Sequence, residues 1–101
     1  MGGSAIGALA SLRADFALIG TSGLDLKEGC STTELSEAEM KQALLARATR
    51  KILLADHTKL EQPSTICFAK WPEFNDWITD TAPDAADRNR LKAQGVIIHT
   101  S

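Results

Sequence analysis

The sequence predicts an α/β fold: one domain of three layers, in which a mostly parallel sheet is flanked by helices. Residues 52–55 form an apolar run with no polar alternation, which is typical of a strand covered on both faces in a parallel sheet. Short apolar runs also alternate along the chain with segments of helical periodicity, the pattern of right-handed βαβ units. The length of 101 residues is enough for one domain, which we expect to span residues 1–101.

The N-terminal third predicts one helix, one strand and one loop. Residues 4–12 are rich in Ala and Leu, with apolar side chains on one helical face, and predict a short helix. Residues 16–19 form an apolar run that stops at Gly20, and predict a strand. Residues 21–33 contain several hydroxyl groups and few apolar residues, with two glycines among them, so we expect a loop there.

The middle of the chain predicts a long helix followed by the most apolar strand. Apolar residues repeat at helical spacing through residues 36–50. Ser36 and Glu39 have the spacing of a capping box, which favours a helix start at this point. The next strand is predicted at residues 51–55.

The C-terminal third predicts two further strands around one helix. Residues 65–69 are a weaker apolar stretch after a loop, and residues 77–79 are a candidate strand. A helix is predicted over residues 83–94, because a proline suits its first turn and Gly95 suits its C-terminal cap. The last strand is predicted at residues 96–98.

Composition and charge exclude several classes of function. The net charge of −2 provides no global basic field for nucleic acid, and no apolar run approaches the roughly 20 residues needed to cross a bilayer. The N-terminus lacks the features of a secretory signal, so we expect a cytoplasmic protein with Cys30 and Cys67 as reduced thiols. Neither cysteine has metal-ligand spacing to another ligand, and we expect no metal or other cofactor.

The predicted sheet is small for a doubly wound fold. A parallel sheet with strands that are apolar on both faces does not end abruptly without leaving an apolar edge. Another part of the same natural protein or a second copy must therefore complete it, and we expect a homo-oligomer.

Polar residues gather at four predicted strand ends, at residues 20–25, 56–59, 80 and 99–101. Ligands of open parallel sheets sit at the carboxyl ends of the strands, so the first two groups matter most. Asp56 and Lys59 follow the most apolar strand, and an ammonium group there is a natural partner for a phosphate or a carboxylate. The simpler alternative is that Asp56 caps the following turn and Lys59 is solvated.

Two further groups of residues are candidates for the same site. Thr21, Ser22 and Gly23 offer backbone N–H groups and hydroxyls that can cradle an anion, or they form a plain turn. Asp25 is either a ligand contact or a turn former. Glu37 and Lys41 share one helical face, either as an exposed salt bridge or aimed at the carboxyl edge of the sheet.

Motifs along most of the chain resemble the C-terminal effector domain of DeoR-type bacterial transcriptional repressors. The likeness begins with residues 16–25, FALIGTSGLD, and continues through residues 37–41, an acidic-Ala-acidic-apolar-Lys helix start. Asp56 and Lys59 match an Asp-x-x-Lys element, and residues 78–80 and 95–98 are similar to the closing strands. The resemblance implies a fold like that of ribose-5-phosphate isomerase and glucosamine-6-phosphate deaminase.

The resemblance also implies a function. Members bind a phosphorylated sugar, and this weakens operator binding by a separate helix-turn-helix domain. This chain would therefore not itself contact DNA. The residues that the resemblance implies at the ligand site are Thr21, Ser22, Gly23, Asp25, Glu37, Lys41, Asp56 and Lys59. We expect these residues to act as ligand contacts and not as catalysts.

Two departures from the family pattern limit the resemblance. Leu60 follows the motif lysine where members usually carry an aromatic residue, and residues 61–62 replace a Gly-Arg pair. The DNA-binding domain and the first half of the effector domain, with its Gly-Thr-Thr anion loop, have no counterpart in the chain. Two alternatives stay open: an aldose–ketose isomerase fragment with Glu37 as base and Lys41 or Lys59 as electrostatic stabiliser, or an interaction fragment without a ligand.

Overall fold

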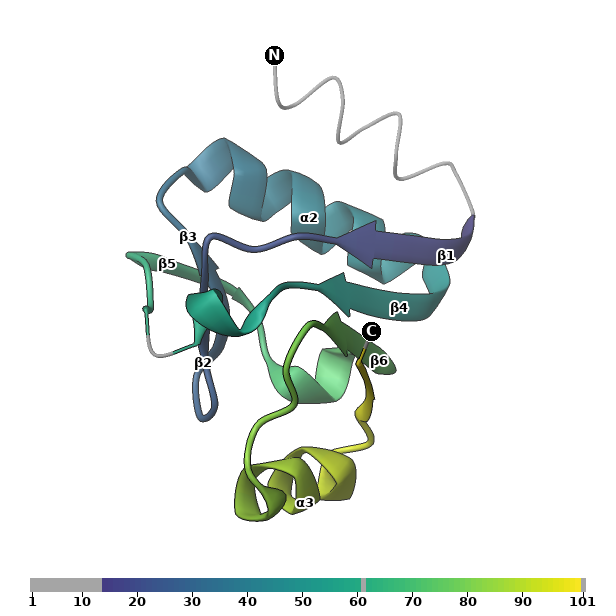
Figure 1. Ribbon diagram of the computed structural model, residues 1–101. Coiled ribbons are helices and arrows are strands. Elements are labelled where there is room, and N and C mark those ends of the chain that lie inside the picture. Colours follow the sequence, from purple (N-terminus) through teal and green to yellow (C-terminus); the bar gives the residue numbers. More distant parts are fainter. Residues whose placement is uncertain (1–13, 61, 101) are drawn as a thin grey trace.

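The computed structural model describes residues 14–60 and 62–100, and it confirms an α/β fold with a parallel sheet flanked by helices (Figure 1). The predicted helix at residues 4–12 lies outside the described residues. Four parallel strands form the main sheet in the order β1-β4-β6-β7. Their bounds are β1 (Ala14–Ile19), β4 (Ala48–Leu54), β6 (Asp76–Thr79) and β7 (Ile97–Thr100).

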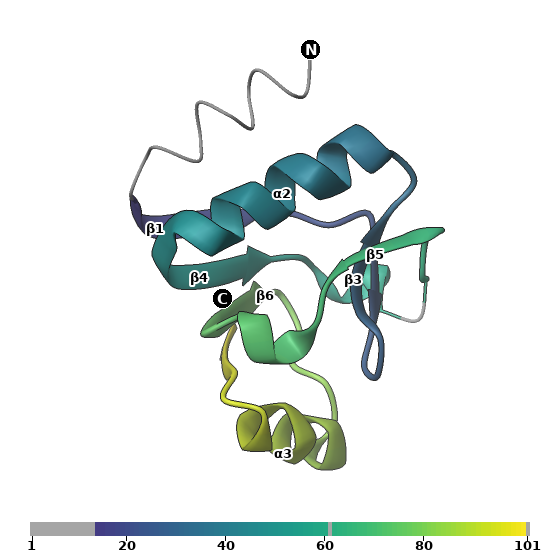
Figure 2. The same cartoon turned by 180° about the vertical axis from the view of Figure 1, so that it is seen from behind.

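Two helices connect the strands of this sheet. Helix α2 (Leu35–Arg47) leads into β4, and helix α3 (Ala85–Ala93) leads from β6 into β7. Helix α2 lies behind β1 and β4 in Figure 1 and in front of them in Figure 2, so it covers one face of the sheet. The N-cap of α3 is Asp84, whose side chain accepts a hydrogen bond from the Asp87 N–H at 2.9 Å.

The predicted bounds of the long helix are wrong at both ends. Its N-cap is Glu34, which makes no side-chain cap hydrogen bond, so the capping box predicted at Ser36 and Glu39 does not form. The helix ends at Arg47 and not at Arg50, because Ala48 is already extended and pairs with Ala14 of β1. Pairing with the neighbouring strand therefore overrides the helical periodicity in these last residues.

The loop predicted at residues 21–33 is also wrong, because this segment contains two strands. Strands β2 (Gly23–Asp25) and β3 (Gly29–Thr32) pair antiparallel, and β5 (Ile66–Ala69) completes a second, three-stranded sheet in the order β2-β3-β5. The turn between β2 and β3 is held by Asp25, whose side chain accepts hydrogen bonds from two following N–H groups, each at 2.8 Å. The weak apolar stretch predicted at residues 65–69 is thus a strand of this second sheet.

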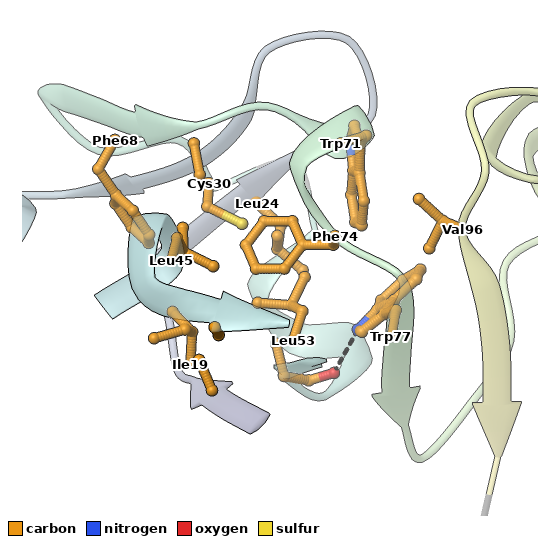
Figure 3. Close-up of a cluster of buried hydrophobic side chains, with 14 of the residues drawn as sticks. Ile19, Leu24, Cys30, Leu45, Leu53, Phe68, Trp71, Phe74, Trp77 and Val96 are labelled. Atoms are coloured by element: carbon orange, nitrogen blue, oxygen red, sulfur yellow. Dashed lines mark hydrogen bonds between the residues drawn. The ribbon is translucent and has the colours of Figure 1, made fainter. Parts of the chain in front are cut away.

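The hydrophobic core joins the two sheets and both helices (Figure 3). Trp71 and Trp77 are both fully buried in it, with their ring centroids 5.3 Å apart. The Trp77 indole N–H donates to the Ala55 carbonyl at 2.9 Å, which ties β6 to the carboxyl end of β4. The thiol of Cys30 is also buried, and burial raises its pKa to about 12.

The face of the main sheet that α2 does not cover is exposed in the part of the chain that the structure describes. Its exposed fractions are 64% for Phe16, 61% for Leu18, 49% for Leu54 and 55% for Ile97. The strand register places these four side chains on the same face. We call this surface the open face. Within residues 14–60 and 62–100, the structure contains no helix of the length and hydropathy required to span a membrane.

Candidate functional site

A cavity of about 480 Å³ lies at the carboxyl edge of the main sheet, where β1, β4 and β6 end side by side. The register aligns these ends, because Ile19 pairs with Leu53 and Leu54 pairs with Ile78. The chain therefore turns away from each strand at the same level and leaves a hollow between the turns. The lining residues are Gly20, Thr21, Leu54, Ala55, Asp56, Lys59, Ile78, Thr79 and Asp80.

Asp56 and Lys59 both line this cavity, as their position after the apolar strand predicts. They belong to a short 3-10 turn, η1 (His57–Lys59), of which Asp56 is the N-cap. The Asp56 carboxylate accepts a hydrogen bond from the Thr58 N–H at 3.1 Å and a second one from the Thr58 hydroxyl. The alternative in which Asp56 caps the turn is therefore what the structure shows.

Lys59 has no ion-pair partner among residues 14–60 and 62–100, Asp56 included. Its side chain is half-buried at the cavity wall. An ammonium group in this position is free to bind an anionic ligand, and partial removal from water strengthens that attraction.

Asp80 is a lining residue that sequence reasoning did not place in the site. Its carboxylate accepts hydrogen bonds from the His57 backbone N–H and from the His57 ring Nδ1–H, each at 2.8 Å. The backbone donor is the larger cause, and the two together lower the pKa of Asp80 to about 2. The signal for Asp80 was present, because it follows the predicted strand at residues 77–79.

Thr21 is the third predicted residue at the cavity. Its hydroxyl donates to the Gly23 carbonyl at 2.7 Å and approaches the Ser31 carbonyl at 3.1 Å. Ser22 is exposed and Gly23 is buried, and neither lines the cavity. Asp25 lies in the turn after β2 and is not a lining residue either.

Glu37 and Lys41 do not line the cavity and do not pair with each other. The Glu37 carboxylate accepts a hydrogen bond from the Thr32 hydroxyl at 3.2 Å. The Lys41 ammonium lies over the ring of Phe68, at 5.1 Å from its centroid. The structure therefore brings together Thr21, Asp56 and Lys59 of the predicted set, and places the other five residues elsewhere.

The cavity combines apolar and polar lining residues. Leu54, Ala55 and Ile78 provide apolar wall, and the polar groups stand at the turns. Within the part of the chain that the structure describes, no three His, Cys, Asp or Glu side chains cluster in a way that could hold a metal ion.

Comparison with known families identifies a match over most of the chain. Residues 1–81 match the family described as the DeoR C terminal sensor domain. This matched range includes all the residues that line the cavity.

Curated proteins similar to the chain include three transcriptional regulators. It is 34% identical over 84 residues to the HTH-type transcriptional regulator GlpR of Haloferax volcanii, covering 83% of this chain and 33% of that protein. It is 34% identical over 95 residues to the HTH-type transcriptional repressor GlcR of Bacillus subtilis, covering 94% and 36%. It is 26% identical over 92 residues to the HTH-type transcriptional repressor CsqR of Escherichia coli, covering 91% and 35%. The chain thus spans about a third of the length of these relatives.

Proposed function

Because this chain belongs to the family of DeoR C-terminal sensor domains, we propose that it binds a phosphorylated sugar and so modulates DNA binding by a separate domain of a cytoplasmic transcriptional regulator. The relatives are named as regulators or repressors, which favours a regulatory role over an enzymatic one. The observation that carries the ligand proposal is Lys59, which lines the cavity and has no ion-pair partner among the described residues.

The proposal assigns roles to the residues that line the cavity. Lys59 binds the phosphate, because an ammonium group is the lining side chain with charge opposite to that of the ligand. Thr21 and Asp56 accept hydrogen bonds from the sugar hydroxyls. The residues predicted for the site but placed outside the cavity remain candidates for contacts with a larger ligand: Ser22, Gly23, Asp25, Glu37 and Lys41.

The mechanism of regulation is differential binding. A ligand shifts a conformational equilibrium only by the difference between its affinities for the two states. The cavity joins turns from three strands, so its shape depends on how these turns are arranged. A ligand that fits one arrangement better stabilises that arrangement. This shift then alters DNA binding by the separate domain.

Isomerase activity is the second candidate, and the geometry disfavours it. The general base of such an isomerase would be Glu37. Its carboxylate accepts a hydrogen bond from the Thr32 hydroxyl, and the residue does not line the cavity. A general base must reach the proton that it removes, at about 3 Å or through one water molecule. Glu37 has no such position relative to the cavity of this chain.

Association with another protein surface is a further part of the proposal. The open face carries exposed Phe16, Leu18, Leu54 and Ile97 on one side of the sheet. Several large apolar side chains exposed on one sheet face often mark a surface that is buried against a partner. A homo-oligomer is the arrangement we propose.

Calorimetric titration of the full chain with a panel of sugar phosphates tests the ligand proposal. We expect binding by the unmodified chain, loss of binding in the Lys59→Ala variant, and an unchanged thermal unfolding profile. Lys27→Ala is the matched control, because Lys27 is exposed in the turn between β2 and β3 and lies outside the cavity. Isomerase turnover that disappears in a Glu37→Gln variant overturns the sensor proposal in favour of an enzyme.

A further inference from the structure

We propose that the cavity selects ligands with one anionic group and a hydroxyl-bearing remainder, and that Asp80, positioned by His57, recognises a hydroxyl of that remainder. The inference rests on the proposed function and narrows its ligand class to monophosphorylated polyols. Neither Asp80 nor His57 belongs to the set of site residues that the sequence predicts.

The charges of the lining residues favour a ligand with a single anionic group. The charged lining residues are Asp56, Asp80 and Lys59, which gives two carboxylates and one ammonium group. One phosphate placed at Lys59 satisfies that cation. A second phosphate on the same ligand then meets a carboxylate, and the described residues that line the cavity include no second cation for it. A bisphosphate is therefore disfavoured relative to a monophosphate.

The hydrogen bonds that Asp80 already accepts determine how many ligand groups it can bind. A carboxylate offers about four acceptor positions. Asp80 uses three of them for the His57 N–H at 2.8 Å, the His57 Nδ1–H at 2.8 Å and the Thr79 hydroxyl at 3.3 Å. One acceptor position is left on a carboxylate that lines the cavity and is held in a fixed direction. That position accepts a hydrogen bond from a single hydroxyl group.

The ionisation of Asp80 supports the same assignment. The hydrogen bonds from His57 lower the pKa of Asp80 to about 2, so this carboxylate stays charged near neutral pH. A charged carboxylate accepts hydrogen bonds and donates none. It attracts hydroxyl groups and repels phosphate oxygens, which orients the ligand with its phosphate toward Lys59 and a hydroxyl toward Asp80.

His57 acts on the ligand only through Asp80. Its ring does not line the cavity. Because Asp80 accepts from Nδ1, the ring carries its proton on that nitrogen, and the ring and the backbone N–H together hold both carboxylate oxygens. His57 is therefore a positioning residue, and its contribution depends on a donor at the place of Nδ1.

Calorimetric titration of the full chain with glucose 6-phosphate, glucose 1,6-bisphosphate and inorganic phosphate tests the inference. We expect the monophosphate to bind about tenfold or more tightly than the bisphosphate, the effect of one charge-assisted contact. In Asp80→Asn, whose amide retains one acceptor but no charge, we expect this ratio to fall toward one. Inorganic phosphate affinity stays within about twofold, because Lys59 is untouched.

Two variants of His57 separate positioning from simple stability. His57→Ala removes the ring donor, and we expect the selectivity ratio to fall as in Asp80→Asn. His57→Asn places an amide N–H close to the position of Nδ1, and we expect it to restore the ratio. Thermal unfolding of each variant, followed by circular dichroism, identifies any loss that arises from unfolding.

The outcomes distinguish the two proposals. Tight binding of the bisphosphate by the unmodified chain, or an unchanged ratio in Asp80→Asn, overturns this inference and leaves the sugar-phosphate proposal intact. Equal ratios in His57→Ala and His57→Asn overturn the positioning role of His57. Absence of binding to all three phosphates overturns the proposed function and this inference with it.

Discussion

Replacement of Gly23 by alanine tests whether this residue supports the fold or contacts a ligand. A Cβ at Gly23 lies 2.1 Å from the backbone carbonyl oxygen of Gln62, and 3.0 Å from both the Ser31 hydroxyl and the Ser64 N–H nitrogen. The first of these contacts is with backbone, which cannot rotate away. The segment that follows Glu61 must therefore move away from β2.

The size of the effect follows from this clash. Overpacking of a buried site costs about 1–3 kcal/mol of stability. The displacement also strains the hydrogen bond from the Ser64 N–H to the Ser31 hydroxyl, at 2.7 Å, so we expect a loss near the upper end of that range. With a slope of about 1–2 kcal/mol per molar urea, the unfolding midpoint falls by roughly 1.5–3 M.

Gly20→Ala provides the matched control, because Gly20 lies three residues before Gly23, directly after the end of β1. A Cβ there meets nothing within 4 Å. We expect this variant to be neutral or more stable by up to about 1 kcal/mol, through reduced freedom of the unfolded chain. Urea unfolding followed by fluorescence of the two buried tryptophans measures both variants. A Gly23→Ala variant as stable as Gly20→Ala refutes the packing of β2 against residues 62–64.

Three further predictions concern the core, the pH dependence and the open face. Trp77→Phe leaves the Ala55 carbonyl without its indole donor, and we expect a loss of about 2–4 kcal/mol in urea unfolding; a loss below about 1 kcal/mol contradicts this. Burial opposes the ionisation of Asp76, but hydrogen bonds from Arg50 and His99 outweigh it and lower the pKa of Asp76. The stability that this carboxylate contributes is therefore present above its unfolded pKa and is lost as the pH falls below about 4; Asp76→Asn flattens that part of the stability–pH curve, and an unchanged curve argues against the hydrogen bonds of Asp76 with Arg50 and His99. Leu18→Ser removes an apolar side chain from the open face, so sedimentation velocity should show weaker self-association; a monodisperse monomer for the unmodified chain disproves the association itself.

Local sequence signals predicted the elements that lie next to the cavity. The apolar run at residues 52–55 indicates an interior strand, and β4 does lie between β1 and β6. The expectation that both of its faces are covered is wrong for this chain, because Leu54 lies on the open face and is 49% exposed. Asp56 and Lys59 follow from that assignment, since a residue just past the end of a parallel strand lies at the carboxyl edge. This part of the site needed no knowledge of distant pairings.

The second sheet could not be predicted in the same way. Strand β2 has three residues and β3 has four, which is too short for alternation to be recognised. Strand β3 is completed by pairing with β5, where Cys30 lies opposite Ala69. That pairing depends on the folded chain, and its energetic contribution comes from packing that no local window contains.

The same limit explains why Asp80, although noted at a predicted strand end, was not assigned to the site, and why five predicted residues lie outside the cavity. The orientation of the Asp80 carboxylate depends on its hydrogen bond with His57. These two residues are distant in sequence and are in contact only because β4 and β6 are neighbours. Glu37 and Lys41 have the spacing of a helical pair, but tertiary neighbours compete for both side chains. Helical spacing predicts which residues share a face, and the contacts on that face decide what they do.

The connection between the cavity and the second sheet gives the sensor proposal a physical route. Thr21 lines the cavity, and its hydroxyl donates to the Gly23 carbonyl and approaches the Ser31 carbonyl, which belong to β2 and β3. A ligand that contacts Thr21 therefore touches the main sheet and the second sheet through one side chain. Asp80 and His57 join the ends of β6 and β4.

If the two sheets have two arrangements, a ligand held between Thr21 and Lys59 distinguishes them, because only one arrangement keeps both contacts at hydrogen-bond distance. Thr21→Val, which retains the shape of the side chain without its hydroxyl, should then weaken coupling between ligand and DNA in a regulator that contains this chain more than it weakens ligand binding. Equal losses in titration and in operator release rule out this route.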